Sequence, residues 1–383
     1  MKPDSTWVSV DHGRHANSPT EIPATGWKDI LWRLYHEIND DRTFLVAAGV
    51  TYYMLLALVP ALSVFVSLYG LFNDRSTIGA HLTLLMGVMP SGGIDILKDQ
   101  LTRLTSTPNT TLSLTLVISL VVALWSASSG IKALFDAMNI AYDETEKRNF
   151  FALNLLALAF TIGAAFAAIV FLSVVVVMPA VLNALYIGKG FEWLIQGLSY
   201  LLMIVLMFAG VGAIYRWGPS RQQAKWRWLT PGAILTVVIT ALVSVLFSWY
   251  AANFGNYNAT YGSLGGLVGM LTWMWLSITI LLIGAELNSE VEHQTARDST
   301  TGAPRPLGDR GAQMADHVAI VGPGARPDGK GRDQPPSLTD RDPSARKGER
   351  RPRRLSVGAL VLALPAALVL AWSKKAQNRQ SYD

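Results

Sequence analysis

The sequence predicts an all-α fold: a polytopic membrane helix bundle with six core transmembrane helices, a seventh C-terminal span and a disordered cytoplasmic tail. Three observations lead to this prediction. Hydrophobic residues make up 51% of the 383 residues and charged residues only 15%, against about 25% charged in a typical soluble domain. The apolar residues gather in long runs, and the basic residues gather on alternate connections between those runs.

Six apolar runs reach the length of about 20 residues that a membrane-spanning helix needs. Lipid offers no partner to backbone N–H and C=O groups, so runs of this kind are predicted to be helices rather than open strands. A seventh run, residues 355–372, has a central Pro365 and basic flanks. It fits a short span or a re-entrant or interfacial helix, and we favour the span. The six core runs are residues 44–72, 112–130, 152–178, 194–215, 229–252 and 264–285.

The chain between the sixth and seventh runs is predicted to be disordered. Residues 287–354 contain no Phe, Trp or Tyr and are rich in Gly and Pro, so they have little apolar surface to bury against the entropy cost of ordering. The predicted organisation is a flexible polar leader, a six-helix membrane domain, a disordered cytoplasmic linker, a C-terminal transmembrane segment and a tail. These parts are residues 1–26, 27–292, 293–354, 355–373 and 374–383.

The distribution of Lys and Arg predicts the orientation. The N-terminal segment, every second connection between the apolar runs and the long tail together carry 24 of these residues, and the remaining connections carry 4. Basic residues favour the cytoplasmic side. The N-terminus and the long tail are therefore expected to be cytoplasmic. Six basic residues in 346–354 either contact anionic lipid head groups or act only as a topology signal. Membrane lipids are the expected partners, and the near balance of charge in the tail argues against a nucleic-acid partner.

Few ionisable residues lie in or beside the apolar runs, so each is a functional candidate. Glu286 ends the sixth run, and Lys132 and Asp136 follow the second run four residues apart. One interpretation is a polar or proton-linked path that involves Glu286 and Lys132. The other is that all three side chains lie at the membrane surface, where Lys132 and Asp136 neutralise each other on one helix face.

Hydroxyl and tyrosine side chains supply the other candidates for a polar cavity. In the fifth run, hydroxyl residues recur every four positions and so share one helix face. They either line a hydrophilic cleft or let two helices approach closely. The uncharged loop before the sixth run adds two tyrosines, which suit a head-group site, a lid or an interfacial turn. These six residues are Thr236, Thr240, Ser244, Ser248, Tyr257 and Tyr261.

Five sequence segments carry a family resemblance: AAGVTYYMLLALVPAL, LWSASSGIKALFDAMNIAYDETEKR, WRWLTPGA, YNATYGSLGGL and LLIGAELN. Together they resemble the YihY/virulence factor BrkB family, formerly labelled ribonuclease BN, over roughly residues 27–292. The resemblance implies a six-helix protein of the bacterial inner membrane, and some members are linked with export of lipid-like envelope components. It brings no established catalytic residues. The long tail and the seventh run depart from the minimal family pattern.

The favoured function is a transporter or flippase of a lipid or other amphipathic envelope component; the alternative is a non-transporting membrane scaffold or envelope-integrity protein. The absence of cysteine excludes thiolate metal sites and cysteine nucleophiles. No Walker motif is present, so no ATP hydrolysis is expected of this chain. Ribonuclease activity is disfavoured, because the six His do not form a metal-binding spacing with Asp or Glu. We therefore expect no enzyme activity, no cofactor and no metal.

Overall fold

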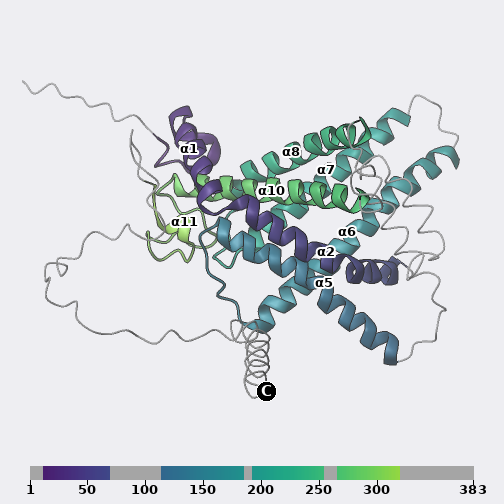
Figure 1. Ribbon diagram of the computed structural model, residues 1–383. Coiled ribbons are helices and arrows are strands. Elements are labelled where there is room, and N and C mark those ends of the chain that lie inside the picture. Colours follow the sequence, from purple (N-terminus) through teal and green to yellow (C-terminus); the bar gives the residue numbers. More distant parts are fainter. Residues whose placement is uncertain (1–11, 70–113, 185–191, 254–264, 320–383) are drawn as a thin grey trace, which may run out of the picture. The chain divides into compact units, whose positions relative to one another are not determined.

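The computed structural model describes residues 12–69, 114–184, 192–253 and 265–319, and these residues are helical with loops and no strand (Figure 1). A short 3-10 helix, η1, covers Pro19–Glu21. The long helices are α1 (Ala24–Asp40), α2 (Thr43–Tyr69), α5 (Leu114–Ala141), α6 (Phe150–Ala184), α7 (Glu192–Trp217), α8 (Trp226–Asn253) and α10 (Gly265–His293), and α11 (Gln313–Asp316) is a single turn.

Each of the six predicted apolar runs coincides with a helix, which confirms the all-helical fold. Four helices contain segments that are long and apolar enough to cross a membrane, in α6, α7, α8 and α10. The described part of α2 contains a shorter apolar segment, Thr43–Leu58. The count of six spans remains a prediction. The seventh run, residues 355–372, lies outside the described residues.

The helices bury one apolar cluster between them and expose many other large apolar side chains on their outer faces. The main buried cluster draws on α2, α5, α7, α8 and α10, and α2 packs mainly on α5 while α8 packs on α10. Large apolar residues such as Phe151, Leu155 and Val245 are exposed on the outer faces of α6 and α8. In water such a surface would be unfavourable, whereas in lipid it costs nothing.

Two glycines let α8 and α10 come into backbone contact. A Cβ atom at Gly232 would overlap the carbonyl oxygen of Gly284, and a Cβ at Gly284 would overlap Thr236 Oγ1 and the Tyr215 hydroxyl. Small residues at helix contacts are the usual means of close packing in membranes. We call this contact the α8–α10 seam; it is formed by Gly232, Thr236, Ser244, Trp273 and Gly284.

One end of the bundle carries a folded polar layer that the sequence did not predict. It comprises residues 12–40, 139–148, 218–225 and 286–319, which we call the polar end, and α1 and α11 lie there in Figure 1. Beneath it, Ile30, Leu34 and Trp228 pack against Leu287 and Val291 of α10.

The structure differs from the expected flexible leader and disordered linker within this layer. Residues 12–23 hydrogen-bond to the end of α10, where Gln294 Nε2 donates to the His12 carbonyl at 2.7 Å. Residues 293–319 are folded, and Thr300 forms an antiparallel bridge with Ala224. The disorder prediction is therefore wrong for 293–319, while residues 320–354 and 1–11 lie outside the described residues.

Candidate functional site

Thr236 is the most firmly held residue of the hydroxyl stripe. It is buried, and its Oγ1 lies 2.6 Å from the Tyr215 hydroxyl of α7. That hydroxyl donates to the Leu281 carbonyl of α10 at 2.8 Å. Thr236 therefore links α8 to α7 and, through Tyr215, to α10. Its hydroxyl is hydrogen-bonded within the protein.

The rest of the stripe runs along the seam toward the far end of α8. Ser244 Oγ accepts a hydrogen bond from Trp273 Nε1 of α10 at 3.3 Å. Thr240 is half-buried and Ser248 is exposed. The contacts of Thr236 and Ser244 support the helix-packing interpretation. Tyr257 and Tyr261 lie outside the described residues.

Glu286 is buried, with only 2% of its surface exposed. Its electrostatic neighbours are the carboxylates of Glu37, Asp41, Asp143 and Glu290. Each of these neighbours is acidic, so none of them offers Glu286 a counter-charge. A carboxylate so placed is costly to keep, which distinguishes Glu286 from an ordinary surface glutamate.

The cations expected near Glu286 are engaged elsewhere. Lys132 Nζ donates to Asn154 Oδ1 of α6 at 2.9 Å and lies over the Trp125 ring. Its i+4 neighbour Asp136 is exposed and forms no ion pair with it. Arg216 Nη1 donates to the Ala224 carbonyl at 2.5 Å. Sequence reasoning therefore placed Lys132 in the wrong pair, because helix spacing alone does not show which neighbouring helix faces it.

A buried ion pair fastens α1 to α10. The guanidinium of Arg33 pairs with the Glu290 carboxylate, and both side chains are buried. Arg33 Nη2 also donates to Gln294 Oε1 at 2.7 Å and to the Glu290 carbonyl at 3.3 Å. Removing one partner of such a pair leaves an unpaired charge in a dry place, so the two residues stabilise the polar end only together.

A second buried ion pair fastens the α7–α8 connection to α10. Arg221 Nη2 and Glu292 Oε2 are 2.6 Å apart, with 2% and 0% of their side chains exposed. Ser299 Oγ donates to the same carboxylate oxygen at 2.7 Å, and the guanidinium lies over the Tyr142 ring. Although burial opposes the charge, the Glu292 carboxylate raises the pKa of Arg221 above its usual value.

These charged residues were missed by the sequence analysis. The signal was present in LNSEVEH, where Glu290 and Glu292 directly follow an apolar run, and in RWGPSR, which contains Arg221. Charges at the end of a span normally lie at the membrane surface. Only the fold of residues 12–40 and 293–319 over them makes them buried.

The loop between α5 and α6 joins the same layer. Arg148 donates to both carboxylate oxygens of Glu146, at 2.8 and 2.7 Å, and these bonds lower the pKa of Glu146 to about 2. The neighbouring Glu144 accepts a hydrogen bond from the backbone N–H of Gln313 at 2.7 Å. This hydrogen bond connects the α5–α6 loop to the segment that follows α10.

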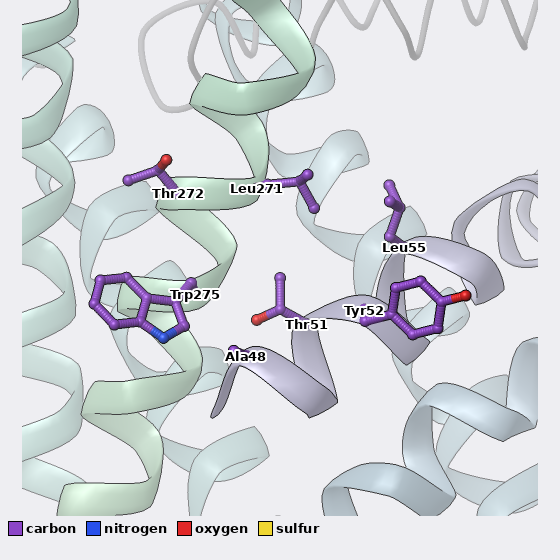
Figure 2. Close-up of a pocket in the computed structure, with 7 residues that line it drawn as sticks. All are labelled: Ala48, Thr51, Tyr52, Leu55, Leu271, Thr272 and Trp275. Atoms are coloured by element: carbon purple, nitrogen blue, oxygen red, sulfur yellow. The ribbon is translucent and has the colours of Figure 1, made fainter. Parts of the chain in front are cut away.

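An open groove of about 330 Å³ lies between α2 and α10 (Figure 2). Its two threonine hydroxyls already have partners within the protein. Thr51 Oγ1 donates to the Ala47 carbonyl at 2.8 Å, and Thr272 Oγ1 donates to the Val268 carbonyl at 2.8 Å. The seven lining residues are Ala48, Thr51, Tyr52, Leu55, Leu271, Thr272 and Trp275.

Long apolar helices with a lipid-compatible outer face define this molecule as a polytopic membrane protein. The family model described as Virulence factor BrkB matches residues 34–307. The chain belongs to this family. The match includes the last turns of α1 and continues into the folded segment after α10, so the family region covers part of the polar end.

Three relatives show how far the similarity extends. The ribonuclease-like protein YfkH of Bacillus subtilis is 31% identical over 185 residues, which are 45% of this chain and 64% of the relative. A UPF0761 membrane protein of Xanthomonas campestris is 28% identical over 270 residues, 68% of this chain and 59% of the relative. One from Aggregatibacter aphrophilus is 23% identical over 68% of this chain and 91% of the relative.

The chain thus spans about six tenths of the first two relatives. No solved structure matches the chain.

Proposed function

We propose that this membrane protein moves a lipid or other amphipathic envelope component across the bilayer, as a transporter or flippase without enzyme activity. The observation that supports this most is the groove between α2 and α10. It is open, it is lined mainly by apolar surface, and α2 on one side of it exposes further large apolar residues such as Leu56.

The chemistry of the groove suits an acyl chain better than a polar molecule. The hydroxyls of Thr51 and Thr272 donate hydrogen bonds to carbonyls of their own helices, and Trp275 Nε1 donates to the Phe44 carbonyl at 3.0 Å. A polar ligand would find few free hydrogen-bonding groups in the groove, whereas an acyl chain needs none. The head group would remain outside the groove.

We further propose that the protein lies in the bacterial inner membrane with a cytoplasmic N-terminus. The support is the excess of basic residues, 24 against 4, on one set of connections. Arg221 and Arg33 of the polar end belong to that set. The polar end would then be cytoplasmic, and anionic head groups are the expected lipid partners.

A membrane scaffold is the second candidate, and the folded polar end favours it. Residues 12–40 and 293–319 form a defined surface that a partner could recognise without any transport. Ribonuclease activity, as the name of the Bacillus subtilis relative suggests, is not proposed. Among the described residues no group of three His, Asp or Glu is arranged to hold a metal ion.

A lipid-translocation assay separates the two candidates. Full-length protein is reconstituted into vesicles that contain a fluorescent phospholipid, and dithionite bleaching reports how much label changes leaflet. We expect faster exchange with the protein than in empty vesicles. Ala48→Phe fills the groove from α2 and should reduce the rate several-fold.

Ala241→Phe is the matched control, because Ala241 is exposed on α8 away from the groove. It should leave the rate unchanged. If wild-type protein moves no lipid with either neutral or anionic head groups, the transport proposal is overturned and the scaffold is favoured. Equal loss in both variants would show that the groove is not the path.

A further inference from the structure

Helix α1 has two distinct faces. Its inner face, with Gly26, Ile30, Arg33 and Leu34, is buried against the end of the bundle. Its outer face exposes large apolar side chains: 55% of Leu31, 60% of Trp32 and 63% of Tyr35. At 100° per residue, these three lie within one third of the helix circumference.

The outer face is presented by a helix that is firmly held. Arg33 pairs with Glu290 and bonds Gln294, so the orientation of α1 about its own axis is fixed. His12 Nδ1 lies 2.6 Å from Asp29 Oδ2, and this contact links the segment that precedes α1 to the same helix. Rotation cannot bury Leu31, Trp32 and Tyr35 without breaking these contacts.

A sharp turn separates α1 from the first long apolar helix. Arg42 adopts φ 52°, and α2 begins at the next residue. Figure 1 shows that α1 does not continue the direction of α2 but lies across the end of α10. Phe44 and Leu45, directly after the turn, are also exposed. The apolar exterior of α2 therefore begins at Phe44, four residues after α1 ends.

We propose that the outer face of α1, formed by Leu31, Trp32 and Tyr35, lies in the head-group region of the bilayer and anchors the polar end to the membrane surface. Trp and Tyr are the residues favoured at that depth, since they combine an apolar ring with a polar edge. Lys28 lies on the same face one turn earlier, where it can reach a lipid phosphate. The occupant of this face is thus lipid.

This placement gives α1 a role that does not depend on transport. It would hold the polar end at a fixed depth while α10, to which it is fastened through Arg33 and Glu290, crosses the membrane. An aqueous location would leave three large apolar side chains in water on a single face, which is unusual unless a partner covers them.

Site-directed spin labelling tests the proposal directly, because the chain has no native cysteine. Single variants Leu31→Cys, Trp32→Cys and Tyr35→Cys are labelled in the full-length protein and reconstituted into nanodiscs of zwitterionic and anionic phospholipid. Collision rates with oxygen, which concentrates in lipid, and with a water-soluble nickel chelate are compared. Asp40→Cys, at an exposed position in the last turn of the same helix and away from the 31/32/35 face, is the control.

We expect nickel collision rates at 31, 32 and 35 to be several-fold lower than at 40, and oxygen rates to be higher. Nickel rates equal to that at 40 would place the face in water and overturn the proposal. Low rates for both reagents together with spin–spin broadening would also overturn it, because they would show a second copy covering the face. Gel-filtration profiles that match the unlabelled protein confirm that each variant is folded.

Discussion

The α8–α10 seam and the polar end are both buried, yet they are held by opposite chemistry. In the seam, Gly232 and Gly284 bring two backbones together, and the polar contacts are uncharged hydrogen bonds of hydroxyl, indole and backbone N–H groups, among them Gly232 N–H to Asn288 Oδ1 at 2.7 Å. In the polar end, Arg33 and Arg221 form buried ion pairs with glutamates of α10. Close packing of backbones thus holds the helices together in the seam, and buried ion pairs hold the segments together in the polar end.

Among substitutions that test this difference, we expect one at Arg221 to lower the free energy of unfolding the most. Arg221→Met leaves the Glu292 carboxylate buried with only Ser299 to bond it, and removing one partner of a buried pair costs about 3–5 kcal/mol. We expect a lower unfolding temperature in detergent and a smaller yield of folded protein.

The double variant Arg221→Met with Glu292→Leu sharpens the test. It removes both charges, so it should recover much of the loss, because apolar replacements of buried pairs are often near neutral. A double variant that is as unstable as the sum of its single variants would contradict a direct coupling between the two side chains.

A smaller effect is expected in the seam. Gly284→Ala places a methyl group against Thr236 Oγ1 and the Tyr215 hydroxyl, and overpacking of this kind costs about 1–3 kcal/mol. Gly269→Ala, on the same helix with open space at its Cβ, is the control and should be neutral or slightly stabilising. Equal thermal stability of the two variants in detergent would show that the backbones are not in contact.

The smallest expected effect depends on pH. Burial, then the carboxylates of Glu290, Asp143, Asp41 and Asp40, raises the pKa of Glu37 on α1 to about 7. The folded state therefore binds more protons than the unfolded state between the unperturbed pKa of 4.5 and 7, and stability falls as the pH rises through that window. Glu37→Gln should stabilise at pH 8 by about 1 kcal/mol, because partial exposure screens the charges, and have no effect at pH 4.

Glu146 is the matched control of opposite sign. Its pKa is lowered to about 2 by Arg148, so its ionised form stabilises the fold above pH 4.5 and this contribution is lost as the pH falls toward 2. Glu146→Gln should therefore destabilise at pH 8. Thermal unfolding of both variants at pH 4 and pH 8 checks the two signs; shifts in the same direction would contradict the assignment.

The sequence was sufficient to predict the helices, because the chemistry of lipid leaves little choice. Runs such as 152–178 and 229–252 cannot hydrogen-bond to their surroundings, so they become α6 and α8. It also predicted that the hydroxyl stripe lies on one face of α8. It could not decide what that face contacts, since Tyr215 and Trp273 come from other helices.

The last segment of the polar end could not be predicted because the contacts that order it are largely polar. Residues 293–319 lack aromatic side chains, which is the composition of a disordered segment. They are ordered instead by hydrogen bonds to buried polar groups. Arg310, itself buried, donates to the carbonyls of Ala296, Arg297, Arg305 and Ala315. Such contacts depend on tertiary structure and leave no periodic pattern.

Hydrogen exchange of the full-length protein in nanodiscs tests most directly whether the polar end is a folded part of the molecule. Three backbone amides connect its segments: Gln222 donates to Gly311, Lys225 to Ser299 and Thr301 to Gln223, at 3.0, 2.9 and 2.8 Å. We predict that peptides covering these amides exchange orders of magnitude more slowly than an unstructured chain. Exchange at the unstructured rate across 298–311, with α10 still protected, would show that the segment is a disordered tail and would contradict the account.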